Sequence, residues 1–234
     1  MARRNTLSAK LRARARKNRD AGGVSPLRRL SCRSHRMRKR ETIVPIILAA
    51  GSSPALPVPK ALALFARKSA MQIAVENCSA LGRPVVVLGS QAKRILPHVP
   101  KPCRVVINRY WRQGQLSSLQ RALKTIPVDT AFLIYPVDHP LLKKSTLAQL
   151  IRAFRNRSAS QEIVMPRHGN GYGHPVIVSS AVRQEFFEAQ TAREVIYRVP
   201  QRLRILDVST SSIFEDFNSL ESYERCVRKF RARK

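Results

Sequence analysis

Residues 43–53 read IVPIILAAGSS, and this stretch decides the fold class. Its first seven residues are apolar without interruption, which is typical of a β-strand that is buried on both faces. The small residues that follow, Ala50, Gly51, Ser52 and Ser53, would let backbone N–H groups approach a phosphate closely. An ordinary turn at the end of a strand has the same composition, so the residues alone leave both interpretations open.

The alternation of apolar runs and helical spacing continues along the chain. Further runs of strand length lie at residues 85–88, 105–107, 131–135, 163–165, 176–178 and 203–208. Segments with helical spacing lie at residues 70–81, 116–124, 145–157, 181–188, 192–198 and 220–230. Buried strands that alternate with amphipathic helices predict an α/β fold with a mostly parallel sheet covered on both faces. Right-handed crossovers make this a three-layer α/β/α sandwich, in which ligands bind beyond the carboxyl ends of the strands.

Positive charge is concentrated in the first 40 residues of this 234-residue chain, whose formal net charge is +30. Residues 1–40 hold 15 Lys and Arg and a single acid, with almost no periodic apolar residues. Such a segment cannot bury enough surface to offset the entropy of ordering, so we expect a disordered basic tail followed by one folded domain at residues 41–234.

Four interpretations of the tail stay open: a nucleic-acid-binding arm, a transit peptide, a solvated tail, and translated sequence upstream of a natural start at Met37. Nucleic-acid binding through the tail is not favoured, because residues 1–40 contain no aromatic side chain that could stack on a base.

Cysteine usage and hydropathy indicate the compartment. The four cysteines are scattered and include no CxxC pair, which fits a reducing cytosol better than a secreted protein or a zinc ribbon. No apolar run approaches the ~20 residues that a membrane-spanning helix needs. We therefore expect a cytoplasmic protein without a membrane partner.

Several polar residues follow the predicted strands. Lys60, downstream of the first strand, can place a positive charge on a phosphate. Asp138 follows residues 131–135 and precedes His139 and Pro140; a carboxylate there can hold Mg²⁺, or it can merely cap the next turn.

Two loop segments can contact a ligand. Asn108, Ser117 and Ser118 surround the start of a predicted helix, a natural place for an anion or a base, although serines are also ordinary residues at helix starts. His174 stands in a glycine-rich turn before a strand, where the glycines and the histidine can equally be structural.

Taken together and in this order, these segments resemble the molybdenum-cofactor cytidylyltransferase-like nucleotidyltransferases of the MobA-like NTP transferase superfamily. The resemblance covers about residues 43–223. It rests on LAAGSS (48–53) with Lys60, VVVLGS (85–90), GQLSSLQ (114–120), DHP (138–140), GYGHPV (171–176), TAREVIYR (191–198) and DFNSLESY (216–223). Each motif alone is weak, but their shared order and spacing are specific.

The resemblance implies a Rossmann-like nucleotidyltransferase fold and a role for each matched residue. The residues implied to bind the nucleotide are Leu48, Ala49, Ala50, Gly51, Ser52, Ser53, Lys60, Asn108, Ser117 and Ser118. Lys60 and Asp138 would be catalytic. Asp138, Asp216 and Asn218 would hold Mg²⁺, and Gly173, His174 and Pro175 would lie on the acceptor side.

The implied reaction is attack by an acceptor's phosphate on the α-phosphorus of an NTP, with release of pyrophosphate. CTP is the favoured nucleotide and molybdopterin cofactor the favoured acceptor, which would place the chain in molybdenum cofactor biosynthesis. Positioning and charge neutralisation are the main requirements of such chemistry.

The chain departs from the family signature G-x-S-x-R-M-G-x-x-K. Residues 51–60 read GSSPALPVPK, so Ala55 replaces an arginine and Pro57 a glycine. Arg67 or Lys68 could supply the missing charge. Two alternatives follow: a catalytically degenerate nucleotide-binding homologue, and a nucleic-acid-binding protein that uses its basic surface.

Overall fold

The computed structural model describes residues 41–233, so the tail predicted at residues 1–40 and the alternative start at Met37 lie outside the described residues. The described residues build one large sheet and a two-stranded hairpin. Strands of the large sheet follow the order β10 (Leu203–Asp207), β7 (Ile163–His168), β9 (Val176–Val178), β6 (Ala131–Pro136), β1 (Ile43–Ala49), β4 (Val85–Leu88) and β5 (Arg104–Ile107), and β8 (Gly171–Tyr172) pairs with β7.

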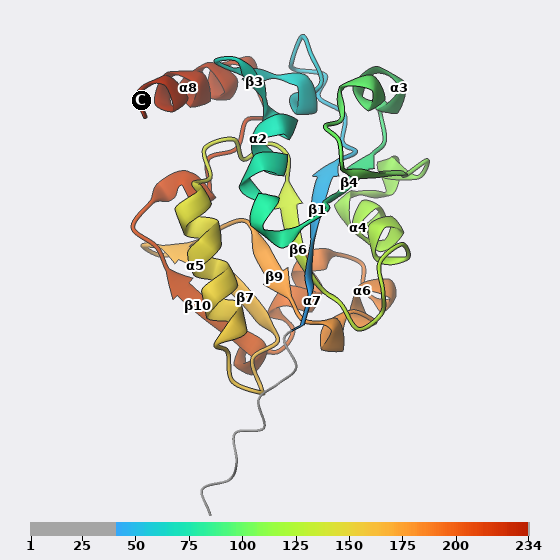
Figure 1. The fold of residues 1–234 in the computed structure, drawn as a ribbon, viewed down its shortest axis with the longest axis vertical. Coiled ribbons are helices and arrows are strands. Elements are labelled where there is room, and N and C mark those ends of the chain that lie inside the picture. Colours follow the sequence, from blue (N-terminus) through green and yellow to red (C-terminus); the bar gives the residue numbers. More distant parts are fainter. Residues whose placement is uncertain (1–40, 234) are drawn as a thin grey trace, which may run out of the picture. The chain divides into compact units, whose positions relative to one another are not determined.

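Strand β1 lies at the centre of the sheet (Figure 1), as its uninterrupted apolar sequence predicts. It pairs in parallel with β4 and β6, so that Ile46 lies opposite Val85 and Ile134. The outer pairs β4–β5 and β7–β10 are also parallel. Strand β9 is antiparallel to both of its neighbours, β6 and β7. The sheet is therefore mostly parallel, as predicted.

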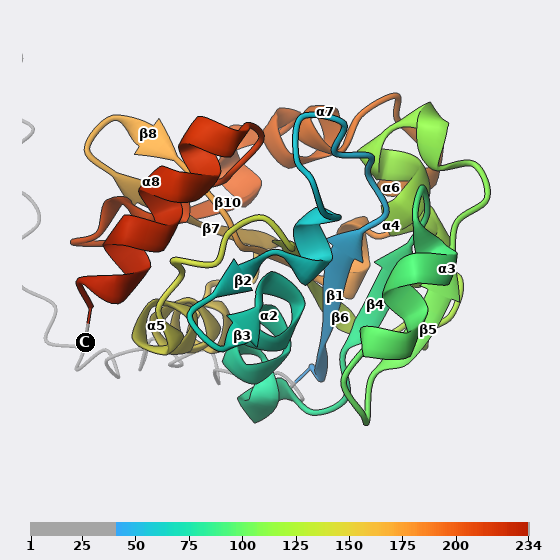
Figure 2. The same ribbon diagram turned by 90° about the horizontal axis from the view of Figure 1, so that it is seen from above.

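Helices cover both faces of the sheet, and Figure 2 shows this layering from above. One face carries α2 (Ala70–Asn77) and α5 (Lys144–Arg155). The other carries α4 (Gln115–Leu123), α6 (Glu185–Glu188) and α7 (Ala192–Tyr197). Alternate residues of β1 divide between the two apolar cores, because Ile43 and Ile47 join the first cluster while Ile46 and Leu48 join the second. The three-layer α/β/α prediction is confirmed.

Several short parts of the fold differ from the predicted elements. The helix expected at residues 70–81 ends at Asn77, followed by a 3-10 turn at Ser79–Leu81, and the helix expected at residues 181–188 is a 3-10 turn at Ser180–Val182 followed by α6. A hairpin of β2 (Leu64–Phe65) and β3 (Lys68–Ser69) and the short α3 (Ala92–Ile95) were not expected. These elements are too short to show a periodicity.

Helix α8 (Leu220–Arg231) packs on the hairpin through aromatic side chains. The Phe65 ring lies 5.5 Å from that of Tyr223 and 5.7 Å from that of Phe230 between ring centroids. The Tyr223 hydroxyl donates a hydrogen bond to the Leu64 carbonyl oxygen at 2.8 Å. The end of the described chain is thereby attached next to the segment that follows β1.

Glu41 fastens the opposite end of the sheet. Its carboxylate pairs with Arg157, after α5, and accepts hydrogen bonds from Ser179 Oγ (3.2 Å), from Ser180 Oγ (2.7 Å) and from the Ser180 backbone N–H (3.2 Å), after β9.

In the described part of the chain, no helix has the length and apolar character needed to cross a membrane.

Candidate active site

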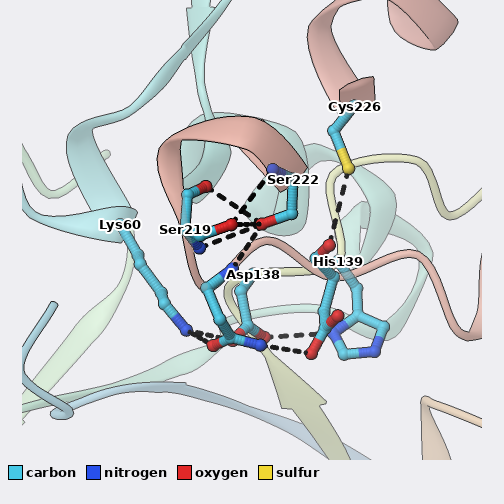
Figure 3. A network of polar contacts seen from close by, with 8 residues as sticks. Lys60, Asp138, His139, Ser219, Ser222 and Cys226 are labelled. Carbon is cyan, nitrogen blue, oxygen red and sulfur yellow. Dashed lines mark hydrogen bonds and ion pairs between the residues drawn. The ribbon is translucent and has the colours of Figure 1, made fainter. Parts of the chain in front are cut away.

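Three segments that are distant in sequence meet beyond the carboxyl ends of β1 and β6. Lys60 opens a 3-10 turn (Lys60–Leu62) after β1, Asp138 follows β6, and Asn218 precedes α8. The Lys60 ammonium donates to Asp138 Oδ2 at 2.8 Å and also to Asn218 Oδ1. Asn218 Nδ2 in turn donates to Asp216 Oδ2 at 2.8 Å. The residues that the resemblance assigned to catalysis and metal binding therefore form one polar network (Figure 3).

Strand pairing accounts for the position of Asp138. Pro136 lies opposite Leu48, and the Val137 N–H donates to the Leu48 carbonyl oxygen at 3.1 Å, so β1 and β6 end side by side. The Asp138 side chain is only 18% exposed. Burial alone would raise the pKa of its carboxyl group, but the hydrogen bond and charge of His139 and the charge of Lys60 outweigh burial and lower that pKa. Asp138 is thus an anion at neutral pH.

A buried hydrogen-bond network supports the turn that carries Asp138. Asn77 Nδ2, on α2, donates to the Tyr135 hydroxyl at 3.1 Å and to the Leu142 carbonyl oxygen at 3.0 Å. The Tyr135 hydroxyl donates to the His139 carbonyl oxygen at 3.2 Å. Burial raises the pKa of Tyr135, which keeps the hydroxyl protonated. The His139 ring is held as well, with its Nδ1 3.1 Å from Asp138 Oδ1.

Capping interactions fix the segment that carries Asn218. Ser219 Oγ accepts from the Ser222 N–H at 3.2 Å, and Ser222 Oγ accepts from the backbone N–H groups of Asn218 and Ser219, both at 2.9 Å. This reciprocal pattern is a capping box at the start of α8. Cys226, one turn further on, contacts the Asp216 carbonyl oxygen through its sulfur at 3.6 Å (Figure 3).

The loop after β1 combines buried and open positions. Leu48 and Ala49 are buried in the two cores, so either could reach a nucleotide only through its backbone. Ser53 is also buried, whereas Gly51 and Ser52 are exposed. A Cβ atom on Gly51 would meet nothing within 4 Å. The space beside this glycine is therefore open.

Asn108 ties the end of β5 to the start of α4. Its amide nitrogen donates to Ser117 Oγ at 2.9 Å and to Ser118 Oγ at 3.0 Å, and its amide oxygen accepts from the Tyr110 N–H at 3.0 Å. Asn108 and Ser118 are almost fully buried, and Ser117 is half-buried. In this arrangement Asn108 and Ser118 shape the loop, and Ser117 is the member of the set with exposed surface.

The predicted acceptor segment joins the site through His174. Its ring packs edge to face on that of His139, with 5.2 Å between centroids, and its Nδ1 is buried without a hydrogen-bond partner. Burial lowers the pKa of His174 to about 4, so the ring is neutral at pH 7. Gly173 is required by packing, since a Cβ atom there would lie 2.4 Å from the Ile213 carbonyl oxygen. Pro175 is buried beside them.

The donor set fits a hard divalent cation such as Mg²⁺. Asp138 and Asp216 offer carboxylate oxygens and Asn218 an amide oxygen, the ligand types that Mg²⁺ prefers. Within residues 41–233 no group of three or more His, Cys, Asp or Glu side chains could hold a metal ion unaided. A divalent ion bound here would therefore have to complete its coordination with water and substrate phosphates, as Mg²⁺ commonly does.

The expected substitutes for the missing arginine lie on the hairpin. Lys68 Nζ already pairs with Glu76 Oε2 at 2.7 Å, and Arg67 is exposed in the turn between β2 and β3. No role was predicted from the sequence for the supporting side chains Asn77 and Tyr135, and His139 was included only as part of the motif DHP (138–140). The one sequence signal for this buried hydrogen-bond network was Tyr135, a polar hydroxyl in an otherwise apolar strand.

Comparison with known proteins identifies the family of the chain. The model of the MobA-like NTP transferase domain matches residues 45–204, which is most of the described chain. The chain belongs to this family. A curated relative, nicotine blue oxidoreductase of Paenarthrobacter nicotinovorans, is 26% identical over 194 residues, covering 78% of this chain and 95% of the relative.

Solved structures of MobA-like and other nucleotidyltransferases share the fold. Rv0371c of Mycobacterium tuberculosis superposes with a TM-score of 0.71 at 21% identity, covering 81% of this chain and 99% of that one. That protein has also been solved in complex with manganese. The molybdopterin-guanine dinucleotide biosynthesis protein A of Archaeoglobus fulgidus superposes with a TM-score of 0.62 at 14% identity, covering 81% and 99%.

Proposed function

We propose that this MobA-like protein is a Mg²⁺-dependent nucleotidyltransferase that moves a nucleoside monophosphate from an NTP onto a phosphorylated acceptor. CTP is the favoured donor and molybdopterin cofactor the favoured acceptor. The observation that carries the proposal is the convergence of Lys60, Asp138 and Asn218, from three distant segments, at the carboxyl ends of β1 and β6. Family membership supports the reaction class, while the choice of CTP and of the acceptor rests on sequence resemblance.

Each group has a role in this reaction. An oxygen of the acceptor phosphate forms a bond to the α-phosphorus as the bond to the pyrophosphate oxygen breaks, and pyrophosphate leaves as an anion. Lys60 would move from Asp138 to the phosphates and offset their charge. Mg²⁺, held by Asp138, Asp216 and Asn218, would supply further charge neutralisation. No general base is required, because a phosphate acceptor is already anionic at neutral pH.

The conformation and surroundings of Gly51, in the loop after β1, support the proposal that this loop binds a nucleotide. Gly51 has an ordinary negative φ and open space around it, so neither conformation nor packing requires a glycine there. A ligand that approaches the backbone closely would require one. By contrast, Gly89 is required by packing, since a Cβ atom there would lie 2.5 Å from the Ala50 carbonyl oxygen.

The test is a thermal-shift panel on the full chain with CTP, GTP, ATP and UTP, each with and without Mg²⁺. A ligand at ~100 times its dissociation constant should add ~2.7 kcal/mol of stability, which is a shift of several degrees. A Mg²⁺-dependent shift with one nucleotide would identify the donor, and release of pyrophosphate in the presence of molybdopterin cofactor would identify the acceptor. No shift with any nucleotide at millimolar concentration would mean that Ala55 and Pro57 have cost the site its ligand, and it would favour a non-catalytic protein that binds no NTP.

A second candidate function is a reduction, motivated by the curated relative that is named an oxidoreductase and matches most of this chain. Replacement of the signature arginine by Ala55 is consistent with a changed ligand. Adding NADH and NADPH to the same panel distinguishes the two. A shift with a nicotinamide dinucleotide, and none with any NTP, would favour the reductase.

A further inference from the structure

Cations without a carboxylate partner gather at one end of the sheet. Residues 77–128 contain nine Lys and Arg and no Asp or Glu. All nine are exposed, and none forms an ion pair with any residue in 41–233. We call this set the basic edge; it consists of Arg83, Lys93, Arg94, Lys101, Arg104, Arg109, Arg112, Arg121 and Lys124.

The fold brings the basic edge together around the last strand of the sheet. Strand β5 pairs only with β4, and α3 and α4 pack on opposite faces beside it. Ile95 of α3 belongs to one core and Leu119 of α4 to the other. Figure 2 shows β4, β5, α3 and α4 grouped at one end of the sheet. The cations therefore lie on the elements that surround one edge of the sheet.

An overall excess of positive charge does not explain this segregation. Elsewhere many cations are paired, as in Lys68–Glu76 (2.7 Å), Arg198–Glu194 (2.7 Å) and Lys229–Glu215 (2.6 Å). Carboxylates are absent from one continuous stretch and present on both sides of it. Unpaired like charges on one surface produce a field that attracts polyanions.

Aromatic side chains at the end of β5 indicate which polyanion fits. Tyr110 is 63% exposed, and the Arg112 guanidinium lies 4.4 Å from the centre of the Trp111 ring. An exposed phenol beside arginines offers stacking to an unpaired base together with contacts to phosphate. A double helix keeps its bases stacked inside, so it would offer this surface phosphates but no free base.

We propose that the basic edge binds single-stranded nucleic acid, with the cations contacting the phosphate backbone and Tyr110 stacking on a base. The proposal does not depend on nucleotidyl transfer, because the cations on α3 and α4 take no part in the network around Lys60 and Asp138.

The test measures binding of a fluorescent oligouridine to the full chain by anisotropy, from about 50 to about 200 mM salt. One variant combines Lys93→Gln, Arg94→Gln and Arg121→Gln. A matched control combines Lys68→Gln, Arg198→Gln and Arg225→Gln, which removes the same charge from cations that face carboxylates. Residues 1–40 contribute equally to all three proteins, and thermal melting confirms that each is folded.

The edge variant should bind at least about tenfold more weakly at the lower salt, and its log–log salt slope should fall by about 2, since each lost single-strand phosphate contact removes about 0.7. The control should stay within about twofold of wild type. Tyr110→Leu should weaken oligouridine binding by about fivefold or more, with a smaller effect on a duplex.

Three results would overturn the proposal. Equal losses in the edge variant and the control would show a general charge effect. Unchanged binding in both would assign the binding to other residues. Competition by polyglutamate as strong as by unlabelled oligouridine, at equal charge, would indicate an acidic protein as the partner.

Discussion

Lys60 is the residue on which the proposed chemistry depends most. It reaches carboxylate and amide oxygens from two other segments, and its ammonium is the cation nearest to Asp138. Replacing Lys60 by Met should lower kcat for pyrophosphate release by roughly 10²- to 10³-fold, because one preorganised charge at the phosphates is lost. Lys144→Met, at an exposed position at the start of α5, is the control and should leave kcat within about twofold. Equal rates for the two variants would remove Lys60 from the mechanism.

Ala55 is the clearest departure from the family signature, and the structure leaves its side chain exposed. Ala55→Arg should strengthen binding of the donor NTP about tenfold or more, since a charge-assisted contact to phosphate contributes ~1.5–3 kcal/mol. The shift in dissociation constant can be read by calorimetry with Ala55→Gln as the uncharged control. An unchanged constant would mean that the triphosphate does not lie beside this loop.

At the level of single residues, the sequence predicted which residues belong to the candidate site better than it predicted the contacts between them. Lys60 and Asp138 could be proposed from their positions after predicted strands, whereas Asp216 and Asn218 could be proposed only through the family motifs. No spacing rule predicts contacts between residues 78 and 158 positions apart. Their convergence is consistent with the assignment, which the experiments above test. The hydrogen bond between Asn108 and Ser118 could not be predicted from the sequence, because it depends on how β5 meets α4.

Among the elements, β6 and the turn that follows it hold the site in place. Tyr135→Phe removes the hydroxyl that accepts from Asn77 and donates to the His139 carbonyl oxygen, leaving two buried polar groups short of a partner. We expect a loss of about 1–3 kcal/mol in the free energy of unfolding, together with a lower kcat, measured by urea denaturation and steady-state kinetics. Tyr110→Phe, at an exposed position, should leave stability unchanged.

Element by element, long periodic segments were predictable and short ones were not. The continuous apolar run of β1 and the pattern of α5 gave both position and type. The β2–β3 hairpin was missed because two-residue strands have no period, and its turn uses Ala66 at a φ of 56° where glycine would be the usual signal. The antiparallel insertion of β9 between β6 and β7 is a tertiary pairing that composition does not encode.

For the whole molecule, Glu41 joins the start of β1 to the segments after α5 and β9. Glu41→Gln leaves Arg157, whose side chain is 6% exposed, without its anionic partner. The cost should be about 2 kcal/mol in unfolding free energy at pH 7. Glu221→Gln, which loses only an exposed 3.9 Å pair with Arg225, should cost less than about 0.5 kcal/mol.

The same carboxylate should give the molecule an acid-sensitive component of stability. Burial would raise the pKa of Glu41, but hydrogen bonds from Ser180 and Arg157 and the charge of Arg157 lower it below the ordinary value of 4.5. Its contribution is therefore complete above that value and is lost as pH falls through the lower folded-state pKa. Glu41→Gln should consequently flatten the decline of stability in this acidic range, and a parallel decline in both proteins would contradict the assignment.

The capping box at the start of α8 has a consequence for biosynthesis. Asn218 is held in place by serines of a helix that leaves the ribosome after every strand of the sheet has been made. A nascent chain that already contains Lys60 and Asp138 in a folded sheet still lacks the amide and the carboxylate of residues 216–218. On the proposed function, premature termination or proteolytic trimming before residue 216 should therefore yield an inactive protein.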